Sequence, residues 1–465
     1  FKQKTAYEIR PRDWSSDVCS SDLSKNAPFR FPLHTQHCYL RPVPDRFPKT
    51  FRVRQKFERP LVAHIAATVR DELTRIEIAQ RIQRGQSVGI TAGSRGIANI
   101  AAILKATVEF FRAVGAQPFI VAAMGSHGGG TPDGQREILR GYRITEDSLG
   151  CPVRTRMETA VIDHTPDGVP VHFGCDAMEA DHVVVVGRVK PHTELFGDHQ
   201  SGLMKMLLIG LGKLEGAKIY HRAFVDHSFD HIVRSVGRRV IEKGRILAGL
   251  GIVENAYDQT GLIRAVLPHE FEAQDRELLA LAVKWLPRLP FDHADLLLVD
   301  EIGKEISGCG MDTNVIGRKR YEHWPAENEF PKIKRIAVRS LTDQTHGNAT
   351  GLGKSEFCLT RVVEAMDRRV TYINVATACY PQVAMIPPHY DTDRELLDVS
   401  LATIGLTEPS RAKLLWIQNT LHVEEVECGE AFLPLARTRG DLEILTEPRA
   451  LPFDAFGMLP RTMRR

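Results

Sequence analysis

Three histidines stand at positions where an imidazole can do chemistry. His127 follows the apolar run IVAAMGS, His192 follows VVVVGRVKP, and His221 ends the segment SGLMKMLLIGLGKLEGAKIYH (201–221). The carboxyl ends of parallel strands meet at one edge of a sheet, so side chains that follow such strands converge. Imidazole acts as an acid, a base or a metal ligand near neutral pH. A single histidine is more often structural, but three at corresponding ends favour a common site.

Lys205 is the unusual residue of the 201–221 segment. It lies among Leu203, Met204, Met206 and Leu207 in a stretch with the composition of a buried element. An ammonium group is costly to bury. Either the amine reaches water along its stem, or it is not an ordinary ammonium.

Two further stretches are suited to anionic groups. In TAGSRG (91–96), Gly93 and Ser94 form a strand-to-helix turn and Arg95 supplies a guanidinium. GSHGGGT (125–131) is typical of a backbone cradle for phosphate, but without a GKS/T motif it is no P-loop. Both stretches are also explained as ordinary turns before helices.

A third group of candidates lies in the second half of the chain. Lys304, in EIGKEISGCGMDTN (301–314), directly follows a predicted strand, and we prefer it to Lys354 of HGNATGLGK (346–354) for a binding role. Cys309 lies in the same stretch, where an inert thiol is the favoured interpretation.

The elements that must position these residues alternate between strand and helix. SVGITAG, PFIVAAMG and DHVVVVGRVKPH indicate buried strands, and GIANIAAILKATVEFFRAVG indicates a helix between the first two. Strand, helix, strand implies a parallel sheet. TAVIDHTPDGVPVHF indicates a hairpin around Pro166-Asp167-Gly168. The second half supplies ADLLLVDEIG, KIKRIAVRSL and TYINVAT as further strands.

We therefore expect an α/β protein of two lobes, each with a Rossmann-like parallel sheet, and an active-site cleft between them. The expected divisions are a non-native or disordered segment (1–56), a cofactor-binding α/β domain (57–267), a connecting helix (268–288) and a C-terminal α/β domain (289–465). Residues 1–23 resemble translated sequencing-adapter read-through and are left out of the fold.

Composition narrows the classes of partner. The net charge is +3 over 465 residues with no basic tract, which gives no reason to expect nucleic acid or an anionic membrane. No apolar run approaches the roughly 20 residues that span a bilayer. None of the eight cysteines forms a CxxC pair, so a zinc ribbon is not expected and a reducing cytoplasm is the expected location.

The order of these motifs resembles the nickel-pincer lactate racemase family, whose members interconvert 2-hydroxy-acid stereoisomers. The resemblance covers most of residues 57–450 and rests on Ser201-Gly202-Leu203-Met204-Lys205, on His221 sixteen residues further on, on Gly125-Ser126-His127 and on Pro191-His192.

The resemblance implies a cofactor and a role for each residue. Lys205 would carry the nickel-pincer nucleotide (a pyridinium-3-thioamide-5-thiocarboxylic acid mononucleotide with nickel) in covalent linkage, and His221 would ligate the nickel. His127 and His192 would be the acid/base pair. The other assigned roles are cofactor binding for Gly93 and Ser94 and substrate binding for Arg95 and Lys304. The implied partners are a small 2-hydroxy acid and cofactor maturation enzymes.

The chain also departs from the family pattern. Ala92 stands where the family has an aspartate, three residues before Arg95, and the stretch from His192 to Lys205 is longer by three residues. His199 is consequently a second candidate for the role of His192. These departures predict a divergent member with a substrate other than lactate.

Two other functions remain open at this stage. A zinc or iron hydrolase would use His127, His192 and His221 as ligands, but leaves Lys205 unexplained. A non-catalytic ligand-binding protein on the same fold is compatible with Ala92.

Overall fold

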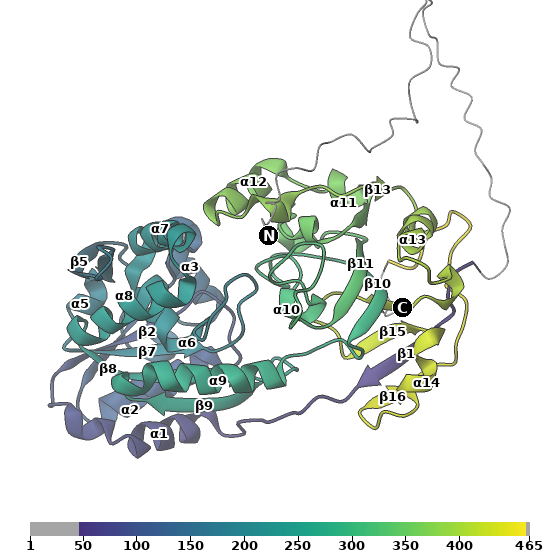
Figure 1. Ribbon diagram of the computed structural model, residues 1–465. Helices are drawn as coiled ribbons and strands as arrows, with labels where there is room; N and C mark the ends of the chain where they lie inside the picture. The colour runs from purple at the N-terminus through teal and green to yellow at the C-terminus, as the bar shows by residue number, and fades with distance from the viewer. Residues whose placement is uncertain (1–45, 462–465) are drawn as a thin grey trace, which may run out of the picture. The chain divides into compact units, whose positions relative to one another are not determined.

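The computed structural model describes residues 46–461. Two large β-sheets with apolar cores and a two-stranded hairpin are the sheets of this part of the chain (Figure 1). The α/β class and the parallel-rich sheets predicted from the sequence are confirmed. Among residues 46–461, none of the helices combines the length and the hydrophobicity that crossing a membrane requires.

The first sheet has the strand order β4-β3-β2-β7-β8-β9, in which β9 alone runs antiparallel to its neighbour. Its strands are β2 (Ser87–Ala92), β3 (Gln117–Ala122), β4 (Val153–Arg154), β7 (His182–Arg188), β8 (Ile246–Glu254) and β9 (Thr260–Val266). β2, β3 and β7 are buried almost throughout, as strands covered on both faces must be.

Helices cover both faces of this sheet. One core contains residues of α1 (Ile65–Arg75) and α2 (Ile100–Ala113), and the other contains residues of α6 (Gly202–Lys205), α7 (Leu211–Asp226) and α8 (Phe229–Lys243). The remaining helices of this half before α9 (Phe271–Trp285) are α3 (Pro132–Gly141), α4 (Glu146–Leu149) and α5 (Cys175–Met178). β5 (Thr159–His164) and β6 (Pro170–Gly174) form a separate antiparallel hairpin, which confirms the predicted turn around Asp167.

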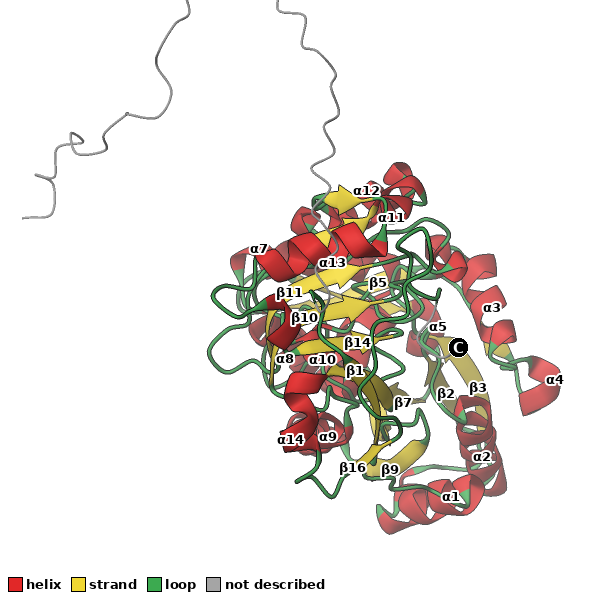
Figure 2. Ribbon diagram, turned by 90° about the vertical axis from the view of Figure 1, so that its right-hand side faces the viewer, coloured by secondary structure: helices red, strands yellow, loops and turns green. Residues whose placement is uncertain are grey.

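The second sheet has the order β13-β12-β11-β10-β14-β15-β1-β16. Its strands are β1 (Thr50–Gln55), β10 (His293–Val299), β11 (Lys332–Val338), β12 (Phe357–Leu359), β13 (His389–Tyr390), β14 (Leu414–Ile417), β15 (Glu425–Gly429) and β16 (Leu442–Ile444). The five strands from β13 to β14 are parallel, whereas β15, β1 and β16 are antiparallel to their neighbours. α13 (Asp393–Ala402) packs on the parallel part (Figure 2). α10 (Thr313–Ile316), α11 (Thr360–Glu364), α12 (Arg368–Thr377) and α14 (Leu433–Ala436) complete this half.

β1 corrects one sequence-based expectation. Residues 50–55 fall within the segment 1–56 that was expected to be non-native or disordered, but they form a strand between β15 and β16. Figure 1 shows this early strand, drawn in purple, beside strands from the yellow end of the chain. Phe51 and Val53 are fully buried there, so the alternating pattern FRV is that of a half-buried strand. The adapter-like residues 1–23 lie outside the described residues.

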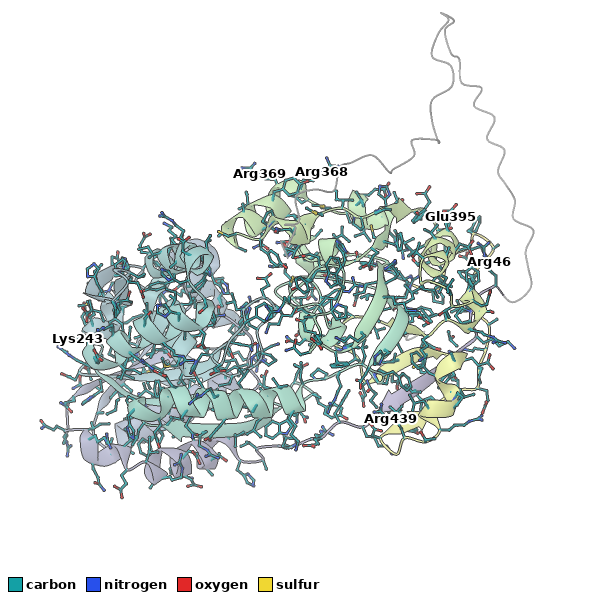
Figure 3. The ribbon with its side chains drawn as sticks, in the orientation of Figure 1. Arg46, Lys243, Arg368, Arg369, Glu395 and Arg439 are labelled. Atoms are coloured by element: carbon teal, nitrogen blue, oxygen red, sulfur yellow. The ribbon has the colours of Figure 1, made fainter. Side chains whose placement is uncertain are left out.

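A second correction concerns TYINVAT, which was expected to be a strand. It lies in α12, where the Asp367 side chain caps the helix by accepting a hydrogen bond from the Val370 N–H. Only Thr371 and Val375 are buried, at the i and i+4 spacing of one helix face. Arg368 and Arg369 point outward at the start of this helix (Figure 3). The β-branched residues misled the prediction because tertiary packing overrode their strand preference.

The two halves are joined by α9 (Phe271–Trp285), which lies along β8 and falls within residues 268–288. A cavity of about 320 Å³ adjoins this connection and the one after β1, and its lining includes Phe57, Trp285, Leu289 and Arg439. No candidate site residue lines this cavity.

Candidate active site

The backbone around Lys205 is fixed by a carboxylate from α9. Asp275 accepts hydrogen bonds from the Leu203 and Met204 N–H groups at 3.0 and 2.8 Å, which satisfies the amino end of α6. Gly202 has φ +85°, and a Cβ there would lie 2.4 Å from Asp275 Oδ1, so only glycine allows this approach. Burial raises the pKa of Asp275 to about 7. A π-helical turn (Met206–Gly210) follows Lys205 directly, a feature frequent at functional sites.

The Lys205 amine is partly buried and has no hydrogen bond or ion pair with any residue in the described range. Its nitrogen lies 5.7 Å from the centre of the Phe229 ring. Burial is the main cause that lowers its pKa from 10.5 to about 7, and the charge of Arg95 adds to it, while Glu194 opposes the shift. At neutral pH about half of such amines are unprotonated, and the unprotonated amine is the nucleophilic form.

Lys213 shows what a lysine with a structural role looks like in the same segment. Its side chain is fully buried, but its Nζ donates a hydrogen bond to the Ala122 carbonyl. Burial lowers its pKa to about 8. Lys213 therefore has a partner for its amine, whereas Lys205 has none among the described residues.

His127 lies in the loop after β3. Its Nδ1 makes a short contact with Ser94 Oγ from the loop after β2, and its backbone carbonyl accepts from Gln135 Nε2 at 3.3 Å. The residue as a whole is exposed, yet desolvation of the ring by the surrounding protein lowers its pKa to about 4. Positive charge on Arg95, Lys205 and Lys304 lowers it further, as protonation of His221 would. The ring is therefore neutral at neutral pH and able to accept a proton.

His192 lies in the loop after β7, and its ring is held by the backbone. Its Nδ1 accepts hydrogen bonds from the N–H groups of Glu194 and Leu195 at 3.0 and 3.1 Å. A neutral imidazole with Nδ1 as acceptor carries its proton on Nε2. Burial, followed by the charges of Lys205 and Lys319, places the pKa of His192 well below its ordinary value.

His199, the alternative to His192, is placed differently. It is buried, its Nδ1 lies 2.9 Å from Asp230 Oδ1, and its Nε2 lies 3.1 Å from the Glu272 carbonyl oxygen. Both ring nitrogens are occupied by protein groups, so His199 ties its loop to α8 and α9. This arrangement favours His192 as the histidine that faces Lys205.

His221 projects from α7. Its ring packs edge-on against Phe224 at 5.7 Å between centres, and burial followed by the charge of Lys205 lowers its pKa. Within residues 46–461 no group forms a hydrogen bond with either ring nitrogen, so the partner expected to orient a metal-ligating imidazole is not found there. The ring is a neutral imidazole with a free lone pair, as metal ligation requires.

The second sheet contributes Lys304, in the loop after β10. Its Nζ donates to the Gly308 carbonyl at 2.5 Å, and burial lowers its pKa. A Cβ at Gly308 would lie 3.6 Å from a guanidinium nitrogen of Arg95, so the loops of both sheets meet here. Lys354 instead is fully buried, with its Nζ 3.2 Å from the Tyr380 hydroxyl. The geometry favours Lys304 over Lys354 for the binding role, because its amine interacts electrostatically with Arg95 and His127.

The remaining candidates are Ser94, Gly93 and Cys309. Ser94 contacts His127, and Gly93 packs near Met206, since a Cβ at Gly93 would lie 3.8 Å from Met206 Cε. Cys309 is buried, and burial and the neighbouring Glu194 carboxylate raise its pKa, which leaves it an inert thiol.

Sequence reasoning missed two residues, Glu194 and Lys319. Glu194 is the acidic group whose charge acts on Lys205, Lys304 and Cys309. The sequence could have indicated Glu194, because it lies only two residues after His192. Lys319 Nζ donates to Gln200 Oε1 at 2.5 Å and lies near His192, but it is more than a hundred residues away in sequence and has no local signature.

Lys319 belongs to a set of contacts that hold the 190–200 loop against the second half of the chain. Thr313 Oγ1 donates to the Thr193 carbonyl, and Asn314 Nδ2 donates to the His192 carbonyl at 3.3 Å. These contacts place His192 beside residues that follow β10 in the chain.

Comparison with known proteins finds a similarity for one part of the chain. Residues 62–231 match the family model of the lactate racemase N-terminal domain. No curated protein matches the chain. Among solved structures, the lactate racemase apoprotein from Thermoanaerobacterium thermosaccharolyticum is 13% identical with a TM-score of 0.48, covering 82% of this chain and 95% of its own. A Thermotoga maritima protein is 14% identical with a TM-score of 0.45, covering 61% and 72%. Residues 62–231, somewhat over a third of the chain, are therefore similar to the lactate racemase N-terminal domain.

Proposed function

We propose that this protein is a racemase or epimerase of a 2-hydroxy acid, an isomerase that works with a nickel-pincer nucleotide linked to Lys205. The observation that carries the proposal is the Lys205 amine, with its pKa lowered to about 7 and without a hydrogen-bond partner among the described residues. The match of residues 62–231 to the lactate racemase N-terminal domain supports the class of reaction.

The residues present fit such a group. An amine that is half unprotonated at neutral pH can form an amide-type linkage, and after linkage no ammonium remains to be buried. His221 offers a neutral imidazole for nickel, and Gly93 and Ser94 lie where β2 ends. When bound, this group supplies a reversible acceptor for the hydride on the carbon that bears the hydroxyl group.

His127 and His192 then have unequal roles. Ser94 Oγ can accept the Nδ1 hydrogen of His127, which leaves a lone pair at Nε2 to take the substrate hydroxyl proton. His192 presents N–H at Nε2 because Nδ1 already accepts from Glu194 and Leu195. It donates a hydrogen bond to the oxygen that becomes a carbonyl. For His192 to act as a base, Nδ1 must take up a proton and release those backbone groups.

Arg95 and Lys304 provide the site for the carboxylate of the substrate. A guanidinium can hold a carboxylate by two parallel hydrogen bonds, and Lys304 adds a second positive charge from the other sheet. Ala92, at the buried end of β2, offers no hydrogen bond where the family has an aspartate. The substrate is therefore proposed to be a 2-hydroxy acid other than lactate.

The alternative of a zinc or iron hydrolase finds less support. In the described part of the chain, the ligand atoms of His127, His192 and His221 do not form a set within 4.8 Å of one another. A non-catalytic ligand-binding protein does not account for the lowered pKa values of Lys205 and His127, since such shifts cluster at functional sites.

The experiment is to co-express the chain with cofactor maturation enzymes and to measure nickel content and intact mass. We expect stoichiometric nickel and an added mass that maps to the peptide carrying Lys205. Chain made without the maturation enzymes is the control. Metal without an adduct would favour the hydrolase, and neither would favour the binding protein.

Isotope retention tests the reaction itself. Single enantiomers of 2-hydroxy acids of differing bulk, with deuterium on the hydroxyl-bearing carbon, are incubated with the loaded protein. Hydride transfer and return keep the deuterium in the product, because the hydrogen does not exchange with water. Loss of the label to solvent in a racemised product would rule out the proposed chemistry.

A further inference from the structure

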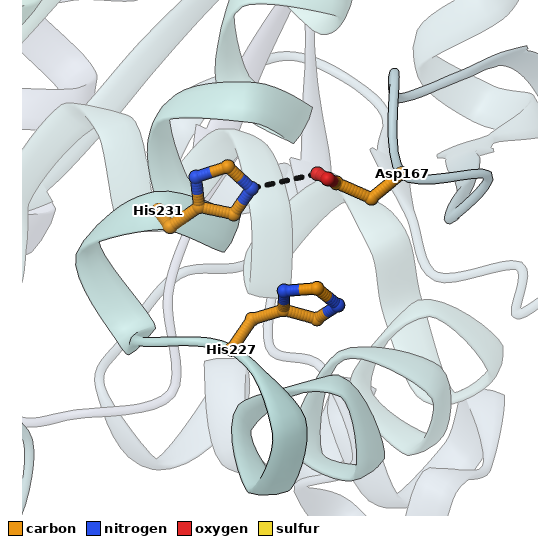
Figure 4. Close-up of side chains that lie close together, drawn as sticks. All are labelled: Asp167, His227 and His231. Atoms are coloured by element: carbon orange, nitrogen blue, oxygen red, sulfur yellow. Dashed lines mark hydrogen bonds and ion pairs between the residues drawn. The ribbon is translucent and has the colours of Figure 1, made fainter.

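A second group of metal-ligating side chains lies outside the candidate active site. Asp167 is in the turn of the β5–β6 hairpin, His227 directly follows α7, and His231 is in the first turn of α8. Their side chains point into one space from these separate elements (Figure 4). We call these three residues the hairpin triad.

The geometry of the hairpin triad is close to that of a metal site. One ligand atom of each residue lies within 4.8 Å of the other two. His231 Nε2 is 2.6 Å from Asp167 Oδ2, and the rings of His227 and His231 lie 5.6 Å apart at 25°. Ligands of a tetrahedral ion with bonds of about 2.1 Å are on the order of 3.4 Å apart, so small side-chain movements suffice.

An ion pair alone does not account for this arrangement. Asp167 and His231 satisfy one another, but His227 is partly buried and neither of its ring nitrogens has a hydrogen-bond partner among residues 46–461. A third ligand-type side chain is thus turned toward the pair without a protein partner of its own.

We propose that Asp167, His227 and His231 bind one divalent transition-metal ion of the zinc type, with a water molecule at the open position. Two imidazole nitrogens and one carboxylate oxygen are the ligands that such ions prefer, whereas Mg²⁺ and Ca²⁺ favour all-oxygen sites. The carboxylate gives the empty site a negative charge that attracts a cation.

The bound ion would join the hairpin to the junction of α7 and α8. His227 is six residues beyond His221, so the ion would also hold the end of the helix that carries the proposed nickel ligand. The proposal concerns a separate site and stands whether or not the protein is a racemase.

The test uses the full chain, made without maturation enzymes and stripped of metal. Titration with Co²⁺ should give visible absorption that saturates at one ion per chain, and Zn²⁺ should displace it. Asp167→Asn and His227→Ala should each weaken Co²⁺ binding at least ~10-fold, because even loss of a second-shell contact costs that much. Circular dichroism confirms that the variants are folded, and Asp167→Asn changes only an exposed turn residue.

Two variants serve as controls. His164→Gln alters an exposed histidine of the same hairpin, and His221→Ala removes the proposed nickel ligand. Both should bind Co²⁺ as the wild type does. The proposal is overturned if the wild type does not bind at micromolar Co²⁺, if the triad variants bind like the wild type, or if only His221→Ala loses the ion.

Discussion

The helices that pack on the first sheet and the loops that follow strands of the second sheet bring different kinds of side chain to the candidate site. From the first come Lys205 and His221, which have lowered pKa values and no hydrogen-bond partners among the described residues. From the second come Lys304 and Lys319, whose amines are bonded to the Gly308 carbonyl and to Gln200. We therefore propose that Lys205 and His221 are available for reaction or ligation, and that Lys304 and Lys319 bind the substrate and hold a loop.

The largest effect is expected from replacing Lys205, which belongs to the group without hydrogen-bond partners among the described residues. Lys205→Ala and Lys205→Arg should both abolish the added mass and the racemase activity, because neither side chain offers an amine. Intact mass spectrometry and a chiral product assay measure this. Lys218→Ala, an exposed lysine on α7 paired only with Glu215, is the matched control and should keep both. An active Lys205→Arg protein would refute the covalent linkage.

Next in size is the loss of proton transfer. His127→Gln and His192→Gln should lower kcat by roughly 10²–10⁴-fold, the usual contribution of a positioned acid or base, with nickel content unchanged. The loss should be larger for His127, because glutamine keeps an N–H that can replace the hydrogen bond from His192 Nε2. Equal losses would show that the two histidines share the proton-accepting role.

His199 provides the contrast to this pair. His199→Ala should act on stability, by removing two hydrogen bonds that tie its loop to Asp230 and Glu272. The expected result is a lower melting temperature with kcat within a few-fold of the wild type. Loss of kcat in a stable His199→Ala protein, together with an active His192→Gln, would exchange their assignments.

A smaller effect is expected from the second sheet. Arg95→Lys and Lys304→Ala should raise KM by roughly 10–100-fold, the equivalent of one charged hydrogen bond of about 1.5–3 kcal/mol, with less change in kcat. Steady-state kinetics on the loaded protein separates the two constants. If both variants keep the wild-type KM, the carboxylate binds elsewhere, and Lys354 is the next residue to replace.

The smallest perturbation leaves the chain intact and titrates Lys205. In protein made without maturation enzymes, labelling of Lys205 by a small amine-reactive reagent should be half-maximal near pH 7, not near pH 10.5. The sign follows from burial, which favours the neutral and reactive amine, so labelling rises as pH passes through this value. Peptide mass spectrometry compares Lys205 with exposed Lys218 in one sample. If labelling of Lys205 and Lys218 showed the same pH dependence, Lys205 would not have the lowered pKa that distinguishes it from an ordinary lysine.

The local sequence pattern was sufficient to predict those elements whose conformation is determined by residues close together in the chain. The buried runs of β2, β3 and β7 and the hairpin turn at Asp167 follow from periodicity and turn chemistry. The proposed site residues His127, His192, Lys205 and His221 were predicted from the sequence, because each follows a predicted strand or stands out in an apolar segment, and their roles stay predictions.

Long-range packing decided the rest. β1 and β16 come from opposite ends of the chain, so nothing near Thr50 shows that it pairs with residues beyond 440. TYINVAT is a helix because its i and i+4 positions meet the core. His192 and His199 are only seven residues apart, and the sequence around them does not show which one is structural. The hydrogen bonds of His199 to Asp230 of α8 and Glu272 of α9 distinguish the two. A hydrogen-bond partner that is distant in the chain leaves no trace in the local residue pattern, and such partners here distinguish a structural side chain from one that is free to react.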